Sequence, residues 1–224
     1  ITGGDIMAII KRYADRDWVL RAIHESIYGI IDGSIENISN DKATYVRDYA
    51  FYQHQNLTTA DFPAATSVGN YSFYKCPVLT SVNTPSVTSI GAFSFKGCSS
   101  LTSANYPMAT TIGQGTFDEC VALSSMNLPL MTVIEPLTFR KCEALTTVDL
   151  PVATSIGTQA FYNSGITSLT LRSDTVVALE NEDAFYFTPI EDGTGYIYVP
   201  SDLVNSYKVA DGWSTYANQI MAIA

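Results

Sequence analysis

The stretch that decides the fold is TSIGAFSFKGCSSLTS, residues 88–103. Its Phe95 belongs to a series that returns every 22 residues, and its Cys98 belongs to a second series with the same spacing. The phenylalanines are Phe51, Phe73, Phe95, Phe117, Phe139 and Phe161, and the cysteines are Cys76, Cys98, Cys120 and Cys142. A fixed period of this length is typical of a solenoid, because one such unit cannot bury its apolar face alone. We therefore predict stacked rungs of 22 residues, with each Phe lying on the Phe of the next rung.

Each unit contains two apolar segments that are predicted to be strands. The first has inward positions such as Leu101 and Ala104, and a proline follows it, at Pro63, Pro85, Pro107, Pro129 and Pro151. The second ends at an apolar position such as Ile90, usually followed by glycine, at Gly69, Gly91, Gly113 and Gly157. Glycine there favours a turn, but Arg47 and Glu135 occupy the same column, so a positive φ is not mandatory. One rung is thus predicted to be a strand, a Pro-bounded corner, a short strand, a glycine turn and a short helical turn carrying Phe and Cys.

The two ends of the chain depart from the repeat and are predicted to cap it. Residues 5–31 have apolar residues at helical spacing, which predicts a helical N-terminal cap over residues 1–33. About seven rungs then occupy residues 34–199, the last one irregular, with a strand at 196–199. A helix is predicted from Asp202, and Trp213, Tyr216, Ile220 and Ile223 follow at helical spacing. Residues 200–224 are therefore predicted to be a helical C-terminal cap of one continuous, monomeric domain that is mostly β with short helices.

The composition excludes several classes of partner. Hydrophobic residues make up 46% of the chain and charged residues 15%, which excludes a disordered chain. A net charge of −10 makes nucleic acid and anionic lipid unlikely partners, and no apolar run reaches the ~18 residues of a membrane helix. The acidic side chains near the C-terminus, Glu180, Glu182, Asp183, Glu191 and Asp192, match no calcium-loop spacing, so a solvated acidic surface is favoured over a cation site.

The repeats resemble the BspA-like leucine-rich repeats of bacterial surface proteins, whose unit runs approximately L-x-x-V-x-L-P-x-x-x-x-x-I-G-x-x-A-F-x-x-C. Residues 88–103 carry this pattern, as does TSIGTQAFYNSGITSLTL, residues 154–171. The resemblance covers about residues 35–200. The segment GTGYIYVPSDLVNSYKVADGWSTYANQI, residues 193–220, also resembles the terminal segment of repeat proteins from gut bacteria and their prophages. The family implies a leucine-rich-repeat solenoid that is secreted or displayed on the cell surface and used in adhesion or host contact.

No catalytic, cofactor or metal site is predicted. The four cysteines lie along a line, with the outer pair about 14 Å apart at ~4.8 Å per rung, so they cannot close a zinc tetrahedron. Buried free thiols are favoured over disulfides between neighbouring rungs, since parallel Cβ vectors make the required torsion unfavourable. His24 and His54 belong to no hydrolase motif. Asp61 and Asp149 share a column but lie four rungs apart, about 19 Å, where a glycosidase pair needs roughly 5–9.5 Å.

The candidate partner-binding residues are aromatic and gather on the first three rungs. They are Tyr49, Tyr52, Tyr71, Tyr74 and Phe93. Later rungs hold Gly115, Leu137 and Gln159 in the first column, and Asp118, Arg140 and Tyr162 in the second, so the repeat does not demand this cluster. Stacked tyrosines suit contact with a protein or a glycan, although the same rings could simply pack on one another. The exposed face of the long strands instead carries small polar residues, which predict a solvated ladder.

The sequence thus supports a non-catalytic binding or adhesion module of a secreted or cell-surface bacterial protein, which recognises a protein or glycan. The alternative is a structural component of a prophage tail or a similar surface assembly, in which the repeats act as a spacer.

Overall fold

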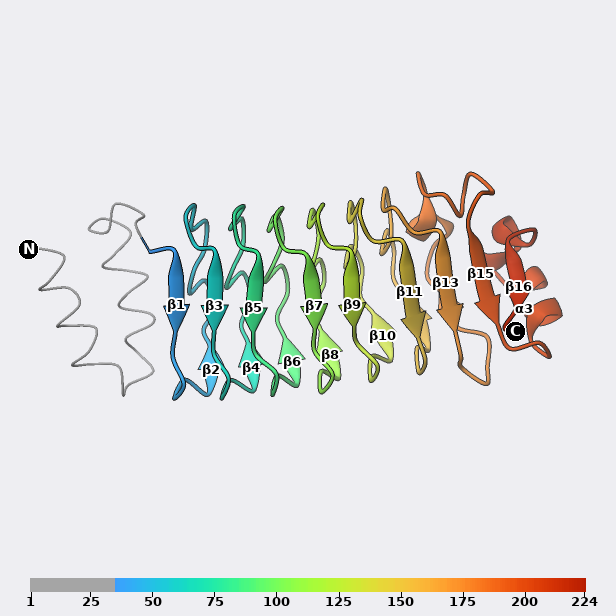
Figure 1. Cartoon of the computed structure of the whole chain (residues 1–224). Coiled ribbons are helices and arrows are strands. Elements are labelled where there is room, and N and C mark those ends of the chain that lie inside the picture. The colour runs from blue at the N-terminus through green and yellow to red at the C-terminus, as the bar shows by residue number, and fades with distance from the viewer. Residues whose placement is uncertain (1–34) are drawn as a thin grey trace, which may run out of the picture.

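The computed structural model describes residues 35–224, so the expected N-terminal cap, residues 1–33, lies outside the described residues. The described chain winds into an elongated stack in which long and short strands alternate (Figure 1). The long strands are β1 (Asn37–Ser39), β3 (Thr59–Asp61), β5 (Ser81–Asn83), β7 (Ser103–Asn105), β9 (Ser125–Asn127), β11 (Thr147–Leu150), β13 (Ser168–Leu171) and β15 (Tyr196–Val199). The short strands are β2 (Tyr45–Val46), β4 (Ser67–Val68), β6 (Ser89–Ile90), β8 (Thr111–Ile112), β10 (Val133–Ile134), β12 (Ser155–Ile156) and β14 (Ala178–Leu179).

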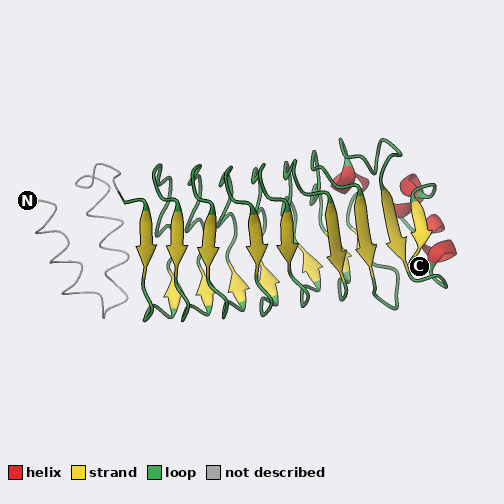
Figure 2. Ribbon diagram, in the orientation of Figure 1, coloured by secondary structure: helices red, strands yellow, loops and turns green. Residues whose placement is uncertain are grey.

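Paired strands of each kind are parallel, mostly with a register of one repeat, and the long-strand ladder is interrupted between β5 and β7 and between β9 and β11. Asn37 lies opposite Thr59, and Tyr45 lies opposite Ser67. The long strands form one face of the stack, and the short strands run beside its lower edge in the view of Figure 2. Along the long-strand face the pairing continues through β13 to β15, which begins an eighth turn. The predicted solenoid is therefore confirmed.

The core is a continuous column of stacked phenylalanine rings. Consecutive rings from Phe51 to Phe161 lie 5.1–5.7 Å apart between centroids, and Phe185 extends the column at 5.5 Å. From Phe73 onward these rings have no solvent exposure. Burying one such ring stabilises the fold by roughly 1.5–3 kcal/mol. The predicted stacking is confirmed, and it runs through the irregular last rung.

The glycines after the short strands permit close approach of backbones. None of them has a positive φ, but a Cβ on Gly91 would lie 2.5 Å from the Asn70 nitrogen, and one on Gly113 would lie 2.4 Å from the Ala92 nitrogen. Their N–H groups donate to carbonyls of the preceding rung. Glu135 occupies this column in the fifth rung, and there, between β8 and β10, the short-strand ladder is interrupted. Glycine at this place thus lets the backbones of successive short strands approach closely.

The segment that carries Phe and Cys is a series of tight turns, and the expected helical turn is absent from rungs one to six. Tyr52 N–H donates to the Tyr49 carbonyl and His54 N–H donates to the Phe51 carbonyl, each spanning three residues. Tyr49 and Gln53 have φ of 58° and 57°, and this left-handed conformation recurs in their columns. A left-handed residue ends any right-handed helix. Only the last rung forms a short 3-10 helix here, η1 (Glu182–Phe185).

The C-terminal segment packs over the last rung but is only partly helical. It contains α3 (Val204–Val209), the 3-10 helix η2 (Trp213–Tyr216) and the strand β16 (Ile220–Ala222), which pairs in parallel with β15. The expected start at Asp202 is two residues early, since residues 201–203 form turns. The expectation of helical spacing through Ile220 is wrong, because the free edge of β15 offers hydrogen bonds that a helix would leave unmade.

Candidate functional site

Five aromatic side chains form a continuous cluster, which we call the aromatic ridge: Tyr49, Tyr52, Tyr71, Tyr74 and Phe93. They lie on the tight turns of the first three rungs, and the repeat register aligns them in two columns. Tyr49 stacks on Tyr71 at 5.1 Å, and Tyr71 stacks on Phe93 at 5.3 Å. In the second column Tyr52 stacks on Tyr74 at 4.9 Å, and Tyr71 touches Tyr74 across the columns at 5.6 Å. The structure thus brings together all five residues singled out from the sequence.

Three residues of the ridge have an unfavourable backbone conformation. Tyr49, Tyr71 and Phe93 have φ of 58°, 55° and 54°. Bulky residues rarely adopt this region, and each instance costs of order 1–3 kcal/mol. The fold imposes the conformation on every rung, since Gly115 has it at 60° in the fourth, where glycine bears no such cost. Placing aromatic residues in the first three rungs is therefore unfavourable for the local backbone.

The ridge residues are partly exposed to solvent. Tyr49 is 44% exposed, and the other four ridge residues are half-buried. Within residues 35–224, the hydroxyls of Tyr49, Tyr71 and Tyr74 have no hydrogen-bond partner. The ridge therefore combines apolar ring area with hydroxyl groups that have no partner among the described residues.

Two lysine ammonium groups lie against rings of the ridge, and a cluster of charged side chains lies beside its last ring, Phe93. The Lys75 ammonium lies 5.3 Å from the Tyr74 ring centroid, and the Lys96 ammonium lies 5.9 Å from that of Phe93. Lys96 also forms an ion pair of 2.8 Å with Asp118, whose side chain is fully buried. Asp118 accepts two further bonds from Arg140, of 2.8 and 2.7 Å, and these raise the pKa of that guanidinium. The cluster neutralises its own buried carboxylate and so has a structural role.

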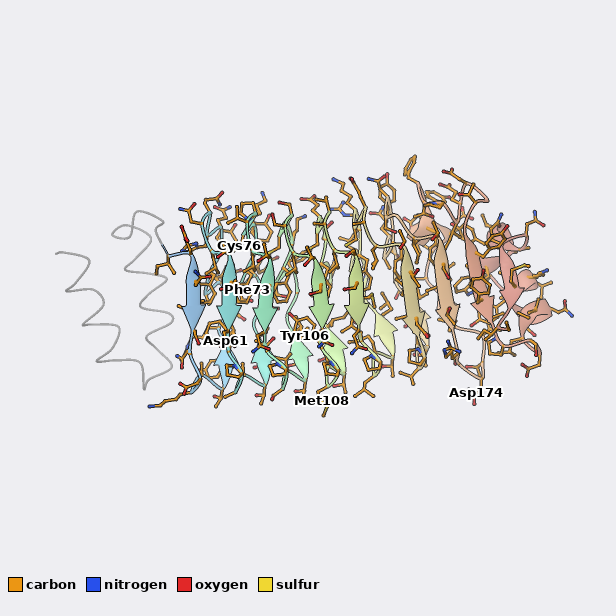
Figure 3. All side chains as sticks on the ribbon, viewed as in Figure 1. Asp61, Phe73, Cys76, Tyr106, Met108 and Asp174 are labelled. Carbon is orange, nitrogen blue, oxygen red and sulfur yellow. The ribbon has the colours of Figure 1, made fainter. Side chains whose placement is uncertain are left out.

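The cysteines are free and buried, as predicted, but they are more than apolar fillers. Each thiol donates to the carbonyl of the Phe one rung earlier, as Cys98 does to Phe73 at 3.1 Å. The same bond recurs from Cys76, Cys120 and Cys142 at 3.0–3.2 Å. Burial raises the pKa of the Cys98, Cys120 and Cys142 thiols. These three thiols therefore stay protonated and unreactive in the folded protein. Figure 3 labels Phe73 and Cys76 within the stack.

The acidic side chains near the C-terminus bond to protein groups. Glu180 accepts from the Thr158 N–H, Asp183 from the Gln159 N–H and Glu191 from the Phe187 N–H. Glu182 accepts from the hydroxyls of Tyr186 and Thr215. No group of three potential metal ligands exists among residues 35–224. Glu180, Glu182, Asp183 and Glu191 are thus engaged by groups of the protein itself.

The long-strand face is a polar ladder over most of its length. Asn83 donates to Asp61 at 2.7 Å and Asn127 donates to Asn105 at 2.9 Å. Arg172 forms a bidentate ion pair with Asp149 on this face. At the C-terminal end β15 adds Tyr196 and Tyr198 to the face, and β16 adds Met221. The 22-residue columns end at Ser168, so they do not predict these aromatics. The alternation of residues in Tyr196–Val199 does predict that both tyrosines lie on this face.

Comparison with known proteins places this parallel-strand solenoid among the leucine-rich repeat proteins. The model of the BspA type leucine rich repeat region matches residues 32–130 and 66–190, with six copies. The chain belongs to this family. A leucine rich cell surface protein of Faecalibacterium prausnitzii A2-165 is similar in structure, with a TM-score of 0.65 and 24% identity over 74% of this chain and 48% of that one.

A leucine-rich repeat protein of Bacteroides ovatus ATCC 8483 is similar with a TM-score of 0.53 and 17% identity, over 74% of this chain and 55% of that one. The chain thus spans about half the length of these two solved relatives. Comparison with curated proteins gives no match. No helix among the described residues is both long and apolar enough to cross a membrane.

Proposed function

We propose that this chain is a non-catalytic binding or adhesion module, displayed outside a bacterial cell, whose aromatic ridge contacts a protein or glycan partner. One observation carries the proposal: five aromatic side chains on adjacent rungs form one stacked cluster that later rungs lack, and the hydroxyls of Tyr49, Tyr71 and Tyr74 have no hydrogen-bond partner among residues 35–224. Two findings support a location outside the cell. The chain belongs to the BspA-type family, and it shares its fold with a leucine rich cell surface protein.

The test replaces the ridge while preserving the fold. Tyr49→Asn and Tyr71→Asn keep the left-handed backbone, because asparagine tolerates it, and Tyr74→Ser removes the third ring. The triple variant and the wild type are screened on an array of glycans and host proteins. We expect a ligand captured by the wild type to be lost, with the circular dichroism spectrum unchanged.

Tyr162→Ser is the matched control, because Tyr162 lies in the same column as Tyr74 but four rungs further on, against Phe187. It should bind as the wild type does. Capture of the same ligand by the triple variant would exclude the ridge as the site. A folded wild type that captures nothing on the array would favour the spacer role in a tail or surface assembly.

A further inference from the structure

We infer that the partner of the aromatic ridge is an acidic segment of polypeptide, which lies along the ring edges. This inference rests on the proposed function, because it names the chemistry of the ligand at the same site. It follows from which parts of the rings are free and from where the unpaired positive charge lies.

The faces of the central ridge rings, Tyr71 and Tyr74, are already covered. Tyr71 lies between Tyr49 and Phe93, with interplanar angles of 6° and 25°, so both of its faces are occupied. Tyr52 covers one face of Tyr74 at 4.9 Å, and the Lys75 ammonium lies over the Tyr74 ring. A sugar ring binds an aromatic residue by laying its C–H groups on the ring face, and that mode is blocked at the centre of this cluster. Ring edges and hydroxyls remain, and these suit the side chains and backbone of a polypeptide.

The far end of the first column is closed as well. A Cβ on Gly115 would lie 2.4 Å from Cε1 of Phe93, so the Phe93 ring fills the space above this glycine. The Lys96 ammonium, 5.9 Å from the same ring, is held by Asp118. Neither Phe93 nor Lys96 leaves an exposed ring face at this end of the ridge.

Lys75 provides the charge that selects the partner. It is exposed, and within residues 35–224 it forms no ion pair. Asp48, which precedes Tyr49, accepts hydrogen bonds from Asn70 and forms no ion pair with Lys75. Residues 35–98 carry four basic and four acidic side chains, whereas residues 99–224 carry four basic and thirteen acidic ones. A negatively charged segment therefore meets less repulsion at the ridge than along residues 99–224, and the Lys75 ammonium adds a local attraction.

The dimensions fit a short extended segment. Three rungs span about 10 Å at ~4.8 Å per rung, and an extended chain rises ~3.3 Å per residue. About three residues therefore cover the ridge, and one carboxylate among them can reach Lys75 while apolar neighbours contact the ring edges.

The experiment uses a random copolymer of glutamate and tyrosine as the probe, with a lysine–tyrosine copolymer and a panel of neutral and sialylated oligosaccharides beside it. Binding to the immobilised full chain is measured by interferometry at low and moderate salt. Lys75→Gln removes the charge, and Gln53 shows that glutamine fits this column, at φ 57°. Lys141→Gln is the control, because Lys141 has the same column and φ of 59° but lies away from the ridge.

We expect the acidic copolymer to bind the wild type, to bind Lys75→Gln about threefold to fivefold more weakly with less salt dependence, and to bind Lys141→Gln unchanged. Equal binding by Lys75→Gln, or no binding of the acidic copolymer to the wild type, would overturn the inference. Capture of an oligosaccharide that Tyr71→Asn abolishes would also overturn it, yet that result would uphold the ridge as the binding site.

Discussion

At the scale of single residues, the cysteine column shows how little freedom the core allows. The Sγ of Cys98 lies 3.1 Å from the Phe73 carbonyl oxygen, within hydrogen-bond reach. Ser164 occupies the column in the sixth rung, and its buried hydroxyl has no partner among the described residues. A C–O bond is about 0.4 Å shorter than a C–S bond, so serine is too short for the acceptor.

The first prediction is that Cys98→Ser is more damaging than Cys98→Ala. Serine buries an unsatisfied hydroxyl, which costs about 1–3 kcal/mol in the free energy of unfolding, whereas alanine leaves only a small cavity. Urea denaturation of both variants measures the difference. Equal or greater stability of the serine variant would mean that the thiol hydrogen bond is unimportant.

The second prediction concerns His54, which holds the cysteine column's place in the first rung. Burial lowers its pKa below the ordinary 6.5, and its Nδ1 has no partner among residues 35–224. As the pH falls below about 6.5, the unfolded chain therefore takes up a proton more readily than the folded one, and stability declines. Above that pH the imidazole is neutral in both states and the effect vanishes.

His54→Cys places the column's own residue at this position and removes the titration. We expect the melting temperature of the wild type to fall further than that of the variant between pH 7 and pH 5. The carboxylates and His24 are present in both proteins, so their effects cancel when the two melting temperatures are compared. Parallel curves over this range would contradict a depressed pKa at His54.

At the scale of elements, the close approach of successive rungs determines where glycine is needed. The third prediction compares Gly91→Ala with Glu135→Ala, two substitutions in one column. A methyl group on Gly91 meets backbone 2.5 Å away, and backbone cannot move aside as a flexible side chain can. We expect a loss of about 1–3 kcal/mol or more, against less than about 0.5 kcal/mol for Glu135→Ala. Similar losses in both would show that the short-strand ladder tolerates a side chain at Gly91.

Most of the fold could be predicted because each rung repeats the same physical requirements. The columns of Phe95, Cys98 and Gly91 repeat because a ring, a thiol and a residue without a side chain fit the neighbouring rung at these places. The period alone was therefore enough to predict the strands, the core and the corners. The turns could not be predicted in the same way. Residues as different as Tyr49, Gly115 and Leu137 share one left-handed conformation, since hydrogen bonds to the next rung impose it whatever the side chain.

The composition of the aromatic ridge could also be predicted, but its geometry could not. Column positions were enough to align Tyr49 with Tyr71 and Tyr52 with Tyr74. That the ring faces would be covered, and that Lys75 would lie over Tyr74, depends on rotamers which a sequence pattern does not specify. Tyr196 and Tyr198 were missed because the last rung is longer than the repeat.

At the scale of the whole molecule, the stability of a solenoid depends on its ends. A terminal rung lacks the neighbouring rung that, elsewhere in the stack, bonds to the backbone and covers the apolar side chains. The C-terminal segment takes the place of the missing rung by bonding to the backbone of Val177. The Tyr207 hydroxyl accepts from the Val177 N–H at 3.0 Å, and the Trp213 indole donates to the Val177 carbonyl at 2.7 Å. Trp213 and Tyr216 also pack against Phe185, the last ring of the core column.

The last prediction is that Trp213→Phe weakens the whole stack from this end. The variant keeps an aromatic ring against Phe185 but leaves the buried Val177 carbonyl without its donor, which costs about 1–3 kcal/mol. Because the edge of β15 and the Phe185 ring lie beneath this segment, its opening exposes an apolar strand edge, and self-association follows. Light scattering during thermal unfolding should show aggregation beginning at a lower temperature than in the wild type. Val209→Ala, at a side chain that is 81% exposed on α3, should leave that temperature unchanged. If Trp213→Phe melts and scatters as the wild type does, the stack does not depend on this hydrogen bond for its C-terminal closure.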